Sequence, residues 1–294
     1  MWILALDGGG SKTLAKLSNI ETGQHWQQQA GPASLTNDFT LALANINLLI
    51  SQLCQASGAV PSQIIAVMGL AGANNSQLQQ QANTELAPLF AQLLITTDAR
   101  TSLYGANLGQ PVIVVALGTG SVAMRLQADG HEHQVGGWGF AIGDEGGGAW
   151  LGKLAMRKLL WQLDSLAGIN SPLLQAIADK TAAKPTPLLS WLQHAKAQDY
   201  AQLAPLVFEY QQQCSIARQL LIQQGQAVSQ LIYAAREDTE LPVVLLGGLA
   251  KLTGTLLRQS EQAILQPAKG SALDGAHFLA LQLYQRDNLH KDLP

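Results

Sequence analysis

The stretch that decides the fold is Leu4-Ala5-Leu6-Asp7-Gly8-Gly9-Gly10-Ser11-Lys12-Thr13. It has a counterpart later in the chain, Val115-Ala116-Leu117-Gly118-Thr119-Gly120-Ser121. In each copy a short apolar run breaks into glycines and a hydroxyl residue, and a second apolar segment follows. This pattern predicts a strand, a tight turn and a strand, with glycines that let backbone N–H groups face an anion. Two such turns, one in each half, indicate two similar domains that grip a polyphosphate, as a phosphoryl-transfer enzyme does.

Two other phosphate-binding motifs do not fit these turns. The Walker A pattern, G-x-x-x-x-G-K-[ST], is absent. The dinucleotide fingerprint G-x-G-x-x-G opens a helix, whereas here a strand is expected after the glycines.

Composition narrows the class of protein. The 294 residues suffice for two domains with cores, and 47% apolar against 13% charged residues indicates a globular fold. A net charge of −3 without a basic block argues against nucleic acid or an anionic membrane as partner. Cys54 and Cys214 form no paired motif, which favours a reducing cytoplasm. We expect no signal peptide, and no uninterrupted apolar run is long enough to span a bilayer.

The first half is expected to alternate strands and helices. The expected strands cover residues 2–6, 13–20, 24–30, 64–70 and 93–97. Helices are expected from a cap at Asn37 or Asp38 to about Ser57, over 76–90, and from Asp98 onward. The turn between the second and third strands is Glu21-Thr22-Gly23.

The second half is expected to repeat this order around a helical insertion. Strands are expected at 112–117, 121–127, 131–135, 242–246 and near 263–266, and helices at 149–163, within 171–237 and at 272–285. Alternation of this kind implies an α/β fold with mainly parallel sheets and helices on both faces. We expect two domains, 1–110 and 111–294, with a last helix that could pack back on the first domain.

The first glycine turn is predicted to hold phosphates. Backbone N–H groups of the turn would face the β- and γ-phosphates, with a hydroxyl from Ser11 or Thr13 and positive charge from Lys12. Asp7, at the strand end, is placed to face Mg²⁺ through water, because Mg²⁺ keeps several waters when bound.

Asp98 is the candidate catalytic base. It ends an expected strand, and strand-terminal carboxylates of a parallel sheet point toward bound ligands. A kinase that acts on an alcohol needs a carboxylate to accept the hydroxyl proton. Asp98 is also expected to cap the helix that follows it.

The segment 136–148 is too rich in glycine for a simple linker. Trp138 could lie against the apolar face of a sugar ring, and Asp144 could accept hydrogen bonds from sugar hydroxyls and also cap the next helix. Farther along, Gly247-Gly248 follows a strand, and two glycines there would let adenine or ribose approach the backbone.

Together these motifs resemble the N-acetylglucosamine kinase and glucosamine kinase group of the actin-like ATPase, sugar-kinase superfamily. The resemblance covers nearly the whole chain and rests on Asp7-Gly8-Gly9-Gly10-Ser11, Thr97-Asp98-Ala99, Gly118-Thr119-Gly120-Ser121, Gly136-Gly137-Trp138-Gly139 with Asp144-Glu145-Gly146, and Gly247-Gly248. It implies two ribonuclease-H-like domains of actin/hexokinase type, hinged over an interdomain cleft.

The resemblance also implies site residues. Asp98 would activate the sugar 6-hydroxyl. The ATP-binding residues would be Gly9, Gly10, Ser11, Lys12, Thr119, Gly120, Gly247, Gly248 and Lys251. The sugar would contact Ser34, Asp98, Gly137, Trp138, Gly139 and Asp144, and the cofactors would be ATP and Mg²⁺.

One position departs from the group. Such kinases usually place a sugar-contacting Asn where Ser34 stands in Gly31-Pro32-Ala33-Ser34. Ser34 keeps a hydroxyl with shorter reach, so the choice of sugar stays open between N-acetylglucosamine, which the Trp138 loop favours, and free glucosamine. The expected protein is a cytoplasmic kinase of a small amino sugar, and the resemblance alone suggests a homodimer.

Two other classes stay open at this stage. An ATPase that activates a partner enzyme, as in activators of 2-hydroxyacyl-CoA dehydratases, would carry an iron–sulfur cluster, for which Cys54 and Cys214 lack a matching context. A sugar sensor without catalysis would not need Asp98 and both turns.

Overall fold

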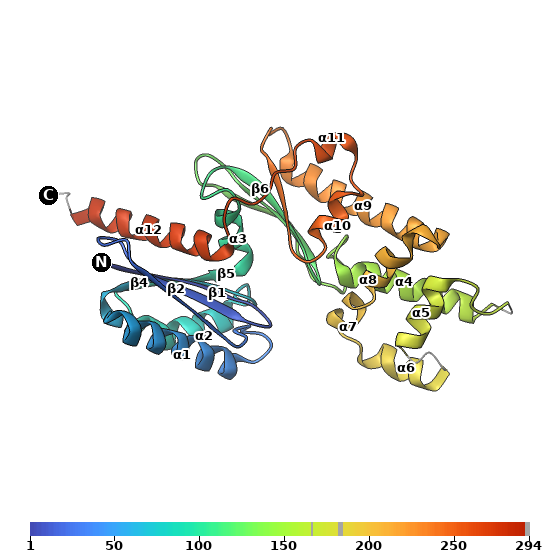
Figure 1. Ribbon diagram of the computed structural model, residues 1–294, viewed down its shortest axis with the longest axis horizontal. Coiled ribbons are helices and arrows are strands. Elements are labelled where there is room, and N and C mark those ends of the chain that lie inside the picture. The colour runs from blue at the N-terminus through green and yellow to red at the C-terminus, as the bar shows by residue number, and fades with distance from the viewer. Residues whose placement is uncertain (166, 182–184, 292–294) are drawn as a thin grey trace. The chain divides into compact units, whose positions relative to one another are not determined.

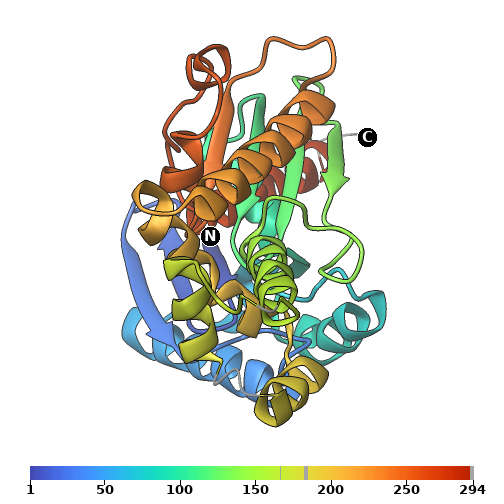
Figure 2. The same ribbon diagram turned by 90° about the vertical axis from the view of Figure 1, so that its right-hand side faces the viewer.

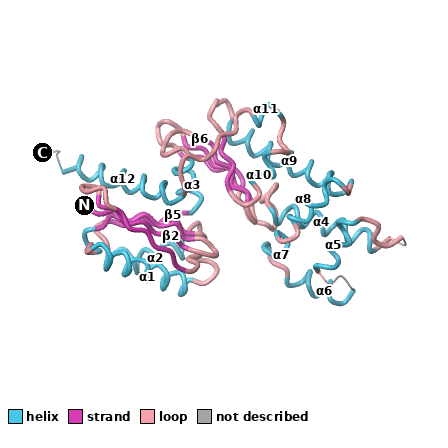
Figure 3. Tube along the Cα trace, viewed as in Figure 1, coloured by secondary structure: helices cyan, strands magenta, loops and turns pink. Residues whose placement is uncertain are grey.

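The computed structural model describes residues 1–165, 167–181 and 185–291. The chain forms two compact units. The first comprises Met1–Val112, Leu126–Gly130 and the segment from Ala268 onward, and the second comprises Ile113–Arg125 and His131–Pro267. Each unit contains one β-sheet with helices packed on it (Figure 3).

The first unit is built on a five-stranded mixed sheet of order β3-β2-β1-β4-β5. Its strands are β1 (Trp2–Gly8), β2 (Thr13–Asn19), β3 (His25–Ala30), β4 (Ile64–Leu70) and β5 (Gln92–Thr97). β4 runs parallel to β1 and β5, whereas β2 is antiparallel to β1 and β3. The five expected strands are confirmed, but the sheet is mixed because the three N-terminal strands form a meander.

Helices cover both faces of this sheet. Figure 1 shows α1 (Phe39–Ser57) and α2 (Ser76–Leu86) on one face, with α3 (Asp98–Ala106) and α12 (Ala272–Lys291) on the other. The expected cap of α1 is confirmed at Asp38, whose carboxylate accepts from the N–H of Leu41, and the helix ends at the left-handed Gly58. The expected helix 76–90 ends early at Leu86, because Pro88 lies in a following 3₁₀ turn and cannot continue an α-helix.

α1 carries the apolar stripe that builds this core. Its buried residues recur at helical spacing, namely Ala42, Leu43, Ile46, Leu49, Ile50 and Leu53. They pack with Leu4, Leu6 and Leu17 of the sheet, and each fully buried Leu or Ile contributes about 1.5–3 kcal/mol. By length and composition alone α1 could also cross a membrane, and no other described helix could. α1 is not an uninterrupted apolar run, because Asn45, Asn47 and Gln52 lie within it, and its packing on the sheet accounts for its apolar face.

α12 packs on α3 through glycines. A Cβ on Gly105 would lie 1.9 Å from the carbonyl oxygen of Ser271, and a Cβ on Gly275 would lie 1.9 Å from that of Thr101. The rings of Tyr104 and Phe278 meet at 5.9 Å. Only glycine allows the two helices to approach this closely, so the C-terminal helix belongs to the first unit.

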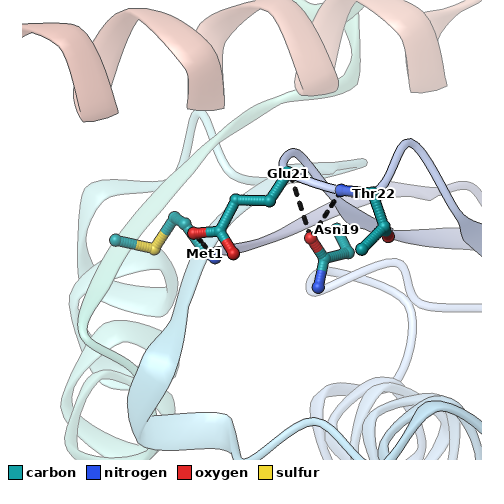
Figure 4. A network of polar contacts seen from close by, with 4 residues as sticks. All are labelled: Met1, Asn19, Glu21 and Thr22. Atoms are coloured by element: carbon teal, nitrogen blue, oxygen red, sulfur yellow. Dashed lines mark hydrogen bonds and ion pairs between the residues drawn. The ribbon is translucent and has the colours of Figure 1, made fainter.

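The turn between β2 and β3 is the expected Glu21-Thr22-Gly23. The side-chain oxygen of Asn19 accepts from the N–H groups of Glu21 and Thr22, and Glu21 forms an ion pair of 2.9 Å with the amino group of Met1 (Figure 4). Gly23 takes the left-handed conformation that closes the turn.

The second unit is built on a four-stranded sheet of order β8-β7-β6-β9. Its strands are β6 (Val112–Leu117), β7 (Ser121–Leu126), β8 (Glu132–Gly136) and β9 (Val243–Leu246), and β6 runs parallel to β9. The helices are α4 (Gly148–Leu163), α5 (Pro172–Lys180), α6 (Pro185–His194), α7 (Ala197–Ala201), α8 (Ala204–Glu209), α9 (Ser215–Arg236), α10 (Ala250–Gly254) and α11 (Gln259–Gln262). The expected strands at 112–117, 121–127, 131–135 and 242–246 are confirmed.

α9 crosses this sheet (Figure 2). Its Val228, Leu231 and Ile232 share a core with Ile113 and Val115 of β6. The expected strand near 263–266 is wrong, because α11 ends at Gln262 and Leu265 makes only an isolated bridge to Val243. Pro267 follows at once and cannot donate to a ladder.

Candidate functional site

The first glycine turn leaves backbone donors free. The N–H of Gly9 donates to the carbonyl of Lys12, and the carbonyl of Gly9 accepts from Ala33. Among the described residues, the N–H groups of Gly10 and Ser11 have no hydrogen-bond partner, and both residues are exposed. Exposed N–H groups of a tight turn are suited to hold an anion such as a phosphate.

Thr13 does not take part in this turn. Its side chain is fully buried, and its hydroxyl donates to the carbonyl of Gly31 at 2.7 Å. The sequence predicts that the hydroxyl at this turn comes from Ser11 or Thr13, and the burial of Thr13 excludes it.

Asp7 and Asp98 come to the same edge of the first sheet. Asp7 pairs with Gly69 of β4, and Gly69 pairs with Thr96 of β5. Thr96 is therefore level with Asp7 across the sheet, and Asp98 comes two residues after Thr96. The carboxyl ends of the parallel strands β1, β4 and β5 meet at this edge, which is where open α/β sheets bind ligands.

The local structure holds Asp98 at the first position of α3. Thr97, not Asp98, is the N-cap, because the Thr97 hydroxyl accepts from the N–H of Arg100 at 3.1 Å. One oxygen of the Asp98 carboxylate accepts from the N–H of Ala99 at 2.9 Å. The expected capping role of Asp98 is therefore wrong, and its second carboxylate oxygen has no hydrogen bond among the described residues.

Burial shifts both carboxylates in the same direction. Loss of water around Asp98 raises its pKa, and hydrogen bonds from the backbone at Ala99 and Asp98 offset part of the rise. Burial also raises the pKa of Asp7, the charge of Asp98 raises it further, and Lys12 lowers it. A carboxylate with a raised pKa is a better proton acceptor, which suits a general base.

Ser34 lies in a loop that borders this edge. The loop bonds to both neighbouring turns, since Ala33 donates to Gly9 and Leu35 donates to Ala71. Ser34 is only 5% exposed, and its hydroxyl lies 3.4 Å from that of Thr36.

Asn37, the other residue expected as a possible cap of α1, is not the cap, because Asp38 takes that position. Its amide nitrogen lies 3.6 Å from the position that a Cβ on Gly10 would occupy, beside the glycine turn. The sequence signal that could have found it is an Asn three residues after Ser34.

The second glycine turn is pinned to the start of α4. The carbonyls of Gly118 and Thr119 accept from the N–H groups of Gly148 and Ala149 at 2.9 and 2.8 Å. The carbonyl groups of the turn are therefore used by α4. The N–H groups of Thr119 and Gly120 have no hydrogen-bond partner among the described residues. This turn thus offers the same free donors as the first.

Asp144 bridges the second turn and the glycine-rich loop. One carboxylate oxygen accepts from the N–H of Gly139 at 3.1 Å, and the other lies 2.3 Å from where a Cβ on Gly120 would be. Its backbone has a positive φ of 61°, which is uncommon for a residue with a side chain. Burial raises the pKa of Asp144. The expected capping role is wrong here also, because Gly147 is the N-cap of α4.

Gly247 and Gly248 lie beside the second turn. A Cβ on Gly247 would meet the carbonyl oxygen of Leu117 at 2.3 Å, and the same carbonyl accepts from Leu249. Leu117 directly precedes Gly118, so both glycine segments share one edge of the second sheet. Gly248 has open space around its Cα, and Lys251 is exposed on α10.

Trp138 stands out from the loop between β8 and α4. Its side chain is 82% exposed, and that of Ile142 is 86% exposed. Gly137 and Gly139 flank Trp138 with φ of 74° and 94°, conformations that favour glycine. The second unit thus gathers Thr119, Gly120, Gly137, Trp138, Gly139, Asp144, Gly247 and Gly248, and the first unit gathers Asp7, Gly9, Gly10, Ser11, Lys12, Ser34 and Asp98.

Sequence reasoning missed two residues that support the second-unit group. Gln224 is fully buried, and its amide donates to the carbonyl of Gly146 and to the hydroxyl of Thr253 on α10. Lys153 of α4 donates to the carbonyl of Phe140 at 3.0 Å. Gln224 could have been found from the sequence, because it is a polar residue within the apolar stripe of α9. Nothing in the sequence distinguishes Lys153 in this way.

The described residues contain no group of three or more His, Cys, Asp or Glu side chains that could hold a metal. Asp7 fits Mg²⁺ in another way. Its ionised form is disfavoured by burial and by the charge of Asp98, so a cation there would relieve both. Mg²⁺ needs few protein ligands because it keeps its waters.

A hollow of about 450 Å³ in the second unit lies elsewhere. It is lined by Gln226, Ser229, Gln230, Tyr233, Arg258 and Glu261. None of these is a candidate site residue.

Two sheets, each with a glycine turn after its first strand, define the two-domain fold of the actin-like ATPase and sugar-kinase superfamily. The chain belongs to the BadF/BadG/BcrA/BcrD ATPase family, whose model matches residues 4–270. The crystal structure of a candidate N-acetylglucosamine kinase from Chromobacterium violaceum aligns with a TM-score of 0.85 and 32% identity, over 96% of this chain and 99% of that one.

Two relatives have names that specify the sugar. The glucosamine kinase of Vibrio cholerae is 25% identical over 99% of both chains. The N-acetyl-D-glucosamine kinase of Dictyostelium discoideum is 26% identical over 86% of both chains. The resemblance found from the motifs is thereby confirmed at the level of family and fold.

Proposed function

We propose that this chain is an ATP-dependent amino-sugar kinase that transfers the γ-phosphoryl group to the 6-hydroxyl of N-acetylglucosamine. The single observation that carries the proposal is the place of Asp98. It is a half-buried carboxylate with one free oxygen, at the same sheet edge as the donor-rich turn Gly9–Lys12.

The proposed chemistry assigns each residue a step. The free oxygen of Asp98 accepts the proton as the sugar O–H bond breaks, the sugar oxygen bonds to the γ-phosphorus, and the bond to the bridging oxygen breaks, so ADP leaves. The N–H groups of Gly10, Ser11, Thr119 and Gly120, with Lys12, would stabilise the phosphate oxygens. Mg²⁺, bound near Asp7 through water, would supply charge neutralisation of the phosphates.

The second-unit residues would bind the rest of the substrates. Trp138, flanked by glycines, offers an exposed ring for the apolar face of a sugar, and Gly137, Gly139 and Asp144 lie next to it. Gly247, Gly248 and Lys251 would line the nucleotide site, because Gly248 leaves its backbone open to a flat ligand.

Glucosamine is the second candidate sugar. Ser34 is buried and short, so it cannot reproduce the amide contacts of the Asn found in such kinases. The Vibrio cholerae relative, which matches along the full chain, is a glucosamine kinase.

The test is ATP consumption with Mg²⁺ on N-acetylglucosamine, glucosamine, glucose and N-acetylmannosamine, with the product examined for a 6-phosphate. Turnover on an amino sugar with a 6-phosphate product supports the proposal, and the preferred sugar decides between the two candidates. Tight sugar binding without ATP consumption would instead indicate a sensor, and ATP hydrolysis without sugar phosphate would indicate a partner-activating ATPase. We expect the enzyme to work in the cytoplasm, and a homodimer would be detected by sedimentation.

A further inference from the structure

The segment 137–144, which we call the tryptophan loop, presents two apolar side chains to solvent. Trp138 is 82% exposed and Ile142 is 86% exposed. Exposed apolar groups do not anchor a loop by burial, and four of the eight residues in the loop are glycine or alanine with little side chain to pack. Its conformation must therefore be held by other contacts.

Lys153 supplies such contacts from α4. Its ammonium group donates to the carbonyl of Phe140 at 3.0 Å and reaches the carbonyl of Ala141 at 3.5 Å. The same ammonium lies 4.2 Å from the centre of the Phe140 ring, within the range of a cation–π interaction. One side chain thus fixes two consecutive residues midway between Trp138 and Ile142.

The Phe140 ring continues this anchor into the helical insertion. It meets the ring of Tyr200 at 5.1 Å, and Tyr200 meets Trp191 edge-on at 5.0 Å. Within the loop, the N–H of Gly143 donates to the carbonyl of Gly139, and the N–H of Gly139 donates to the carboxylate of Asp144. The middle of the loop is therefore connected to the rest of the unit through Phe140 and Lys153, and its end is connected through Asp144, which lies against Gly120.

We propose that Lys153 is a positioning residue that holds the tryptophan loop in the conformation that receives the sugar. The inference rests on the proposed function, because it takes Trp138 and Asp144 as sugar contacts. Within the described part of the chain, the hydrogen bonds and the ring contact of the Lys153 ammonium are to Phe140 and Ala141, and none is to Trp138 or Asp144. Its loss should free the loop without removing a group that touches substrate.

Lys153→Met tests this, because Met keeps an unbranched stem and loses only the charged donor. Lys158→Met is the matched control, since Lys158 is an exposed lysine on the same helix. Lys153→Arg is the conservative variant, which keeps a cation that can bond carbonyls and stack on a ring.

The first readout is hydrogen–deuterium exchange of residues 137–147 in the sugar-free protein. We expect exchange in Lys153→Met to be faster by roughly tenfold, with no change in Lys158→Met and partial recovery in Lys153→Arg. The second readout is kinetic, on the full chain. The KM for the sugar should rise by about tenfold, while the KM for ATP changes less than about twofold.

The outcomes separate this inference from the proposed function. Unchanged loop exchange in Lys153→Met would overturn the role of Lys153 whether or not the protein is a kinase. Faster exchange with an unchanged sugar KM would show an anchor that does not serve the sugar, which also overturns the proposal. If the unmodified protein phosphorylates no amino sugar, the proposed function fails, and the role of Lys153 in sugar binding fails with it. The exchange measurement still shows whether Lys153 holds the loop.

Discussion

The negative charge of Asp98 raises the pKa of Asp7, although 91 residues of sequence separate them. The register of β1, β4 and β5 brings the two carboxylates to one sheet edge. Two neighbouring carboxylates that are poorly hydrated do not both ionise freely, because each negative charge disfavours the other. Such a pair is suited to accept a proton at one carboxylate and to bind a cation at the other. This relationship supports the proposed division of roles, in which Asp98 would act as the base and Asp7 would face the metal.

Asp98→Asn should lower kcat by roughly 10²–10⁴-fold, because the amide cannot accept the hydroxyl proton. The KM for the sugar should stay close to that of the unmodified protein, since the amide keeps most hydrogen bonds. Glu85→Gln, which neutralises an exposed carboxylate on α2, is the matched control and should leave kcat unchanged. Steady-state kinetics of both variants give the answer, and near-normal turnover in Asp98→Asn would remove Asp98 from the mechanism.

The same variant should be more stable than the unmodified protein at neutral pH. A raised pKa in the folded state means that folding disfavours ionised Asp98, so its unfavourable contribution appears as pH rises through the folded pKa and is absent below the unfolded pKa. Thermal melts from pH 3 to 8 should show a Tm advantage for Asp98→Asn that grows with pH. A constant difference across that range would contradict the raised pKa.

Gly247→Ala and Gly248→Ala should have different consequences. A Cβ on Gly247 would press on the Leu117 carbonyl, and its φ of 97° suits only glycine, so we expect destabilisation on the order of 2–4 kcal/mol. Gly248 has free space and ordinary backbone angles, so Gly248→Ala should fold with an unchanged Tm.

The Gly248 variant then tests the nucleotide site directly. Its added methyl group would meet a ligand that lies on the backbone, so the KM for ATP should rise about tenfold while the KM for the sugar does not. Equal ATP affinity in Gly248→Ala and the unmodified protein would place the nucleotide elsewhere.

Ser34→Ala should change the response to sugar and not to ATP. Removal of the hydroxyl costs one hydrogen bond to the sugar, which corresponds to roughly a 2–10-fold rise in sugar KM. Because Ser34 is buried, the Tm must be measured alongside, and a change in Tm with no change in sugar KM would make Ser34 a structural residue. Comparing kcat/KM for glucosamine and N-acetylglucosamine shows which sugar uses the hydroxyl.

Much of the local structure at the candidate site could be predicted from sequence because its signals are local. Glycines between two apolar runs predict a turn with free N–H groups, and both turns have them. The strand that ends at Thr97 and the helix from Asp98 also follow from neighbouring residues. The capping roles of Asp98 and Asp144 could not be settled this way, since Thr97 and Gly147 stand at the caps and a shift of one to three residues decides which side chain bonds.

The sequence by itself determined the two glycine turns, the family and every strand except the one wrongly expected near 263–266, because backbone freedom and apolar periodicity are properties of short segments. Only the tertiary structure decided that Thr13 is buried, that Asp7 and Asp98 interact, and that Asp144 lies against Gly120. It also decided that α12 packs on α3 and that Lys153 holds the tryptophan loop. The physical reason is that burial and charge interaction depend on distances across the fold, which strand register and helix packing set and which no single segment contains.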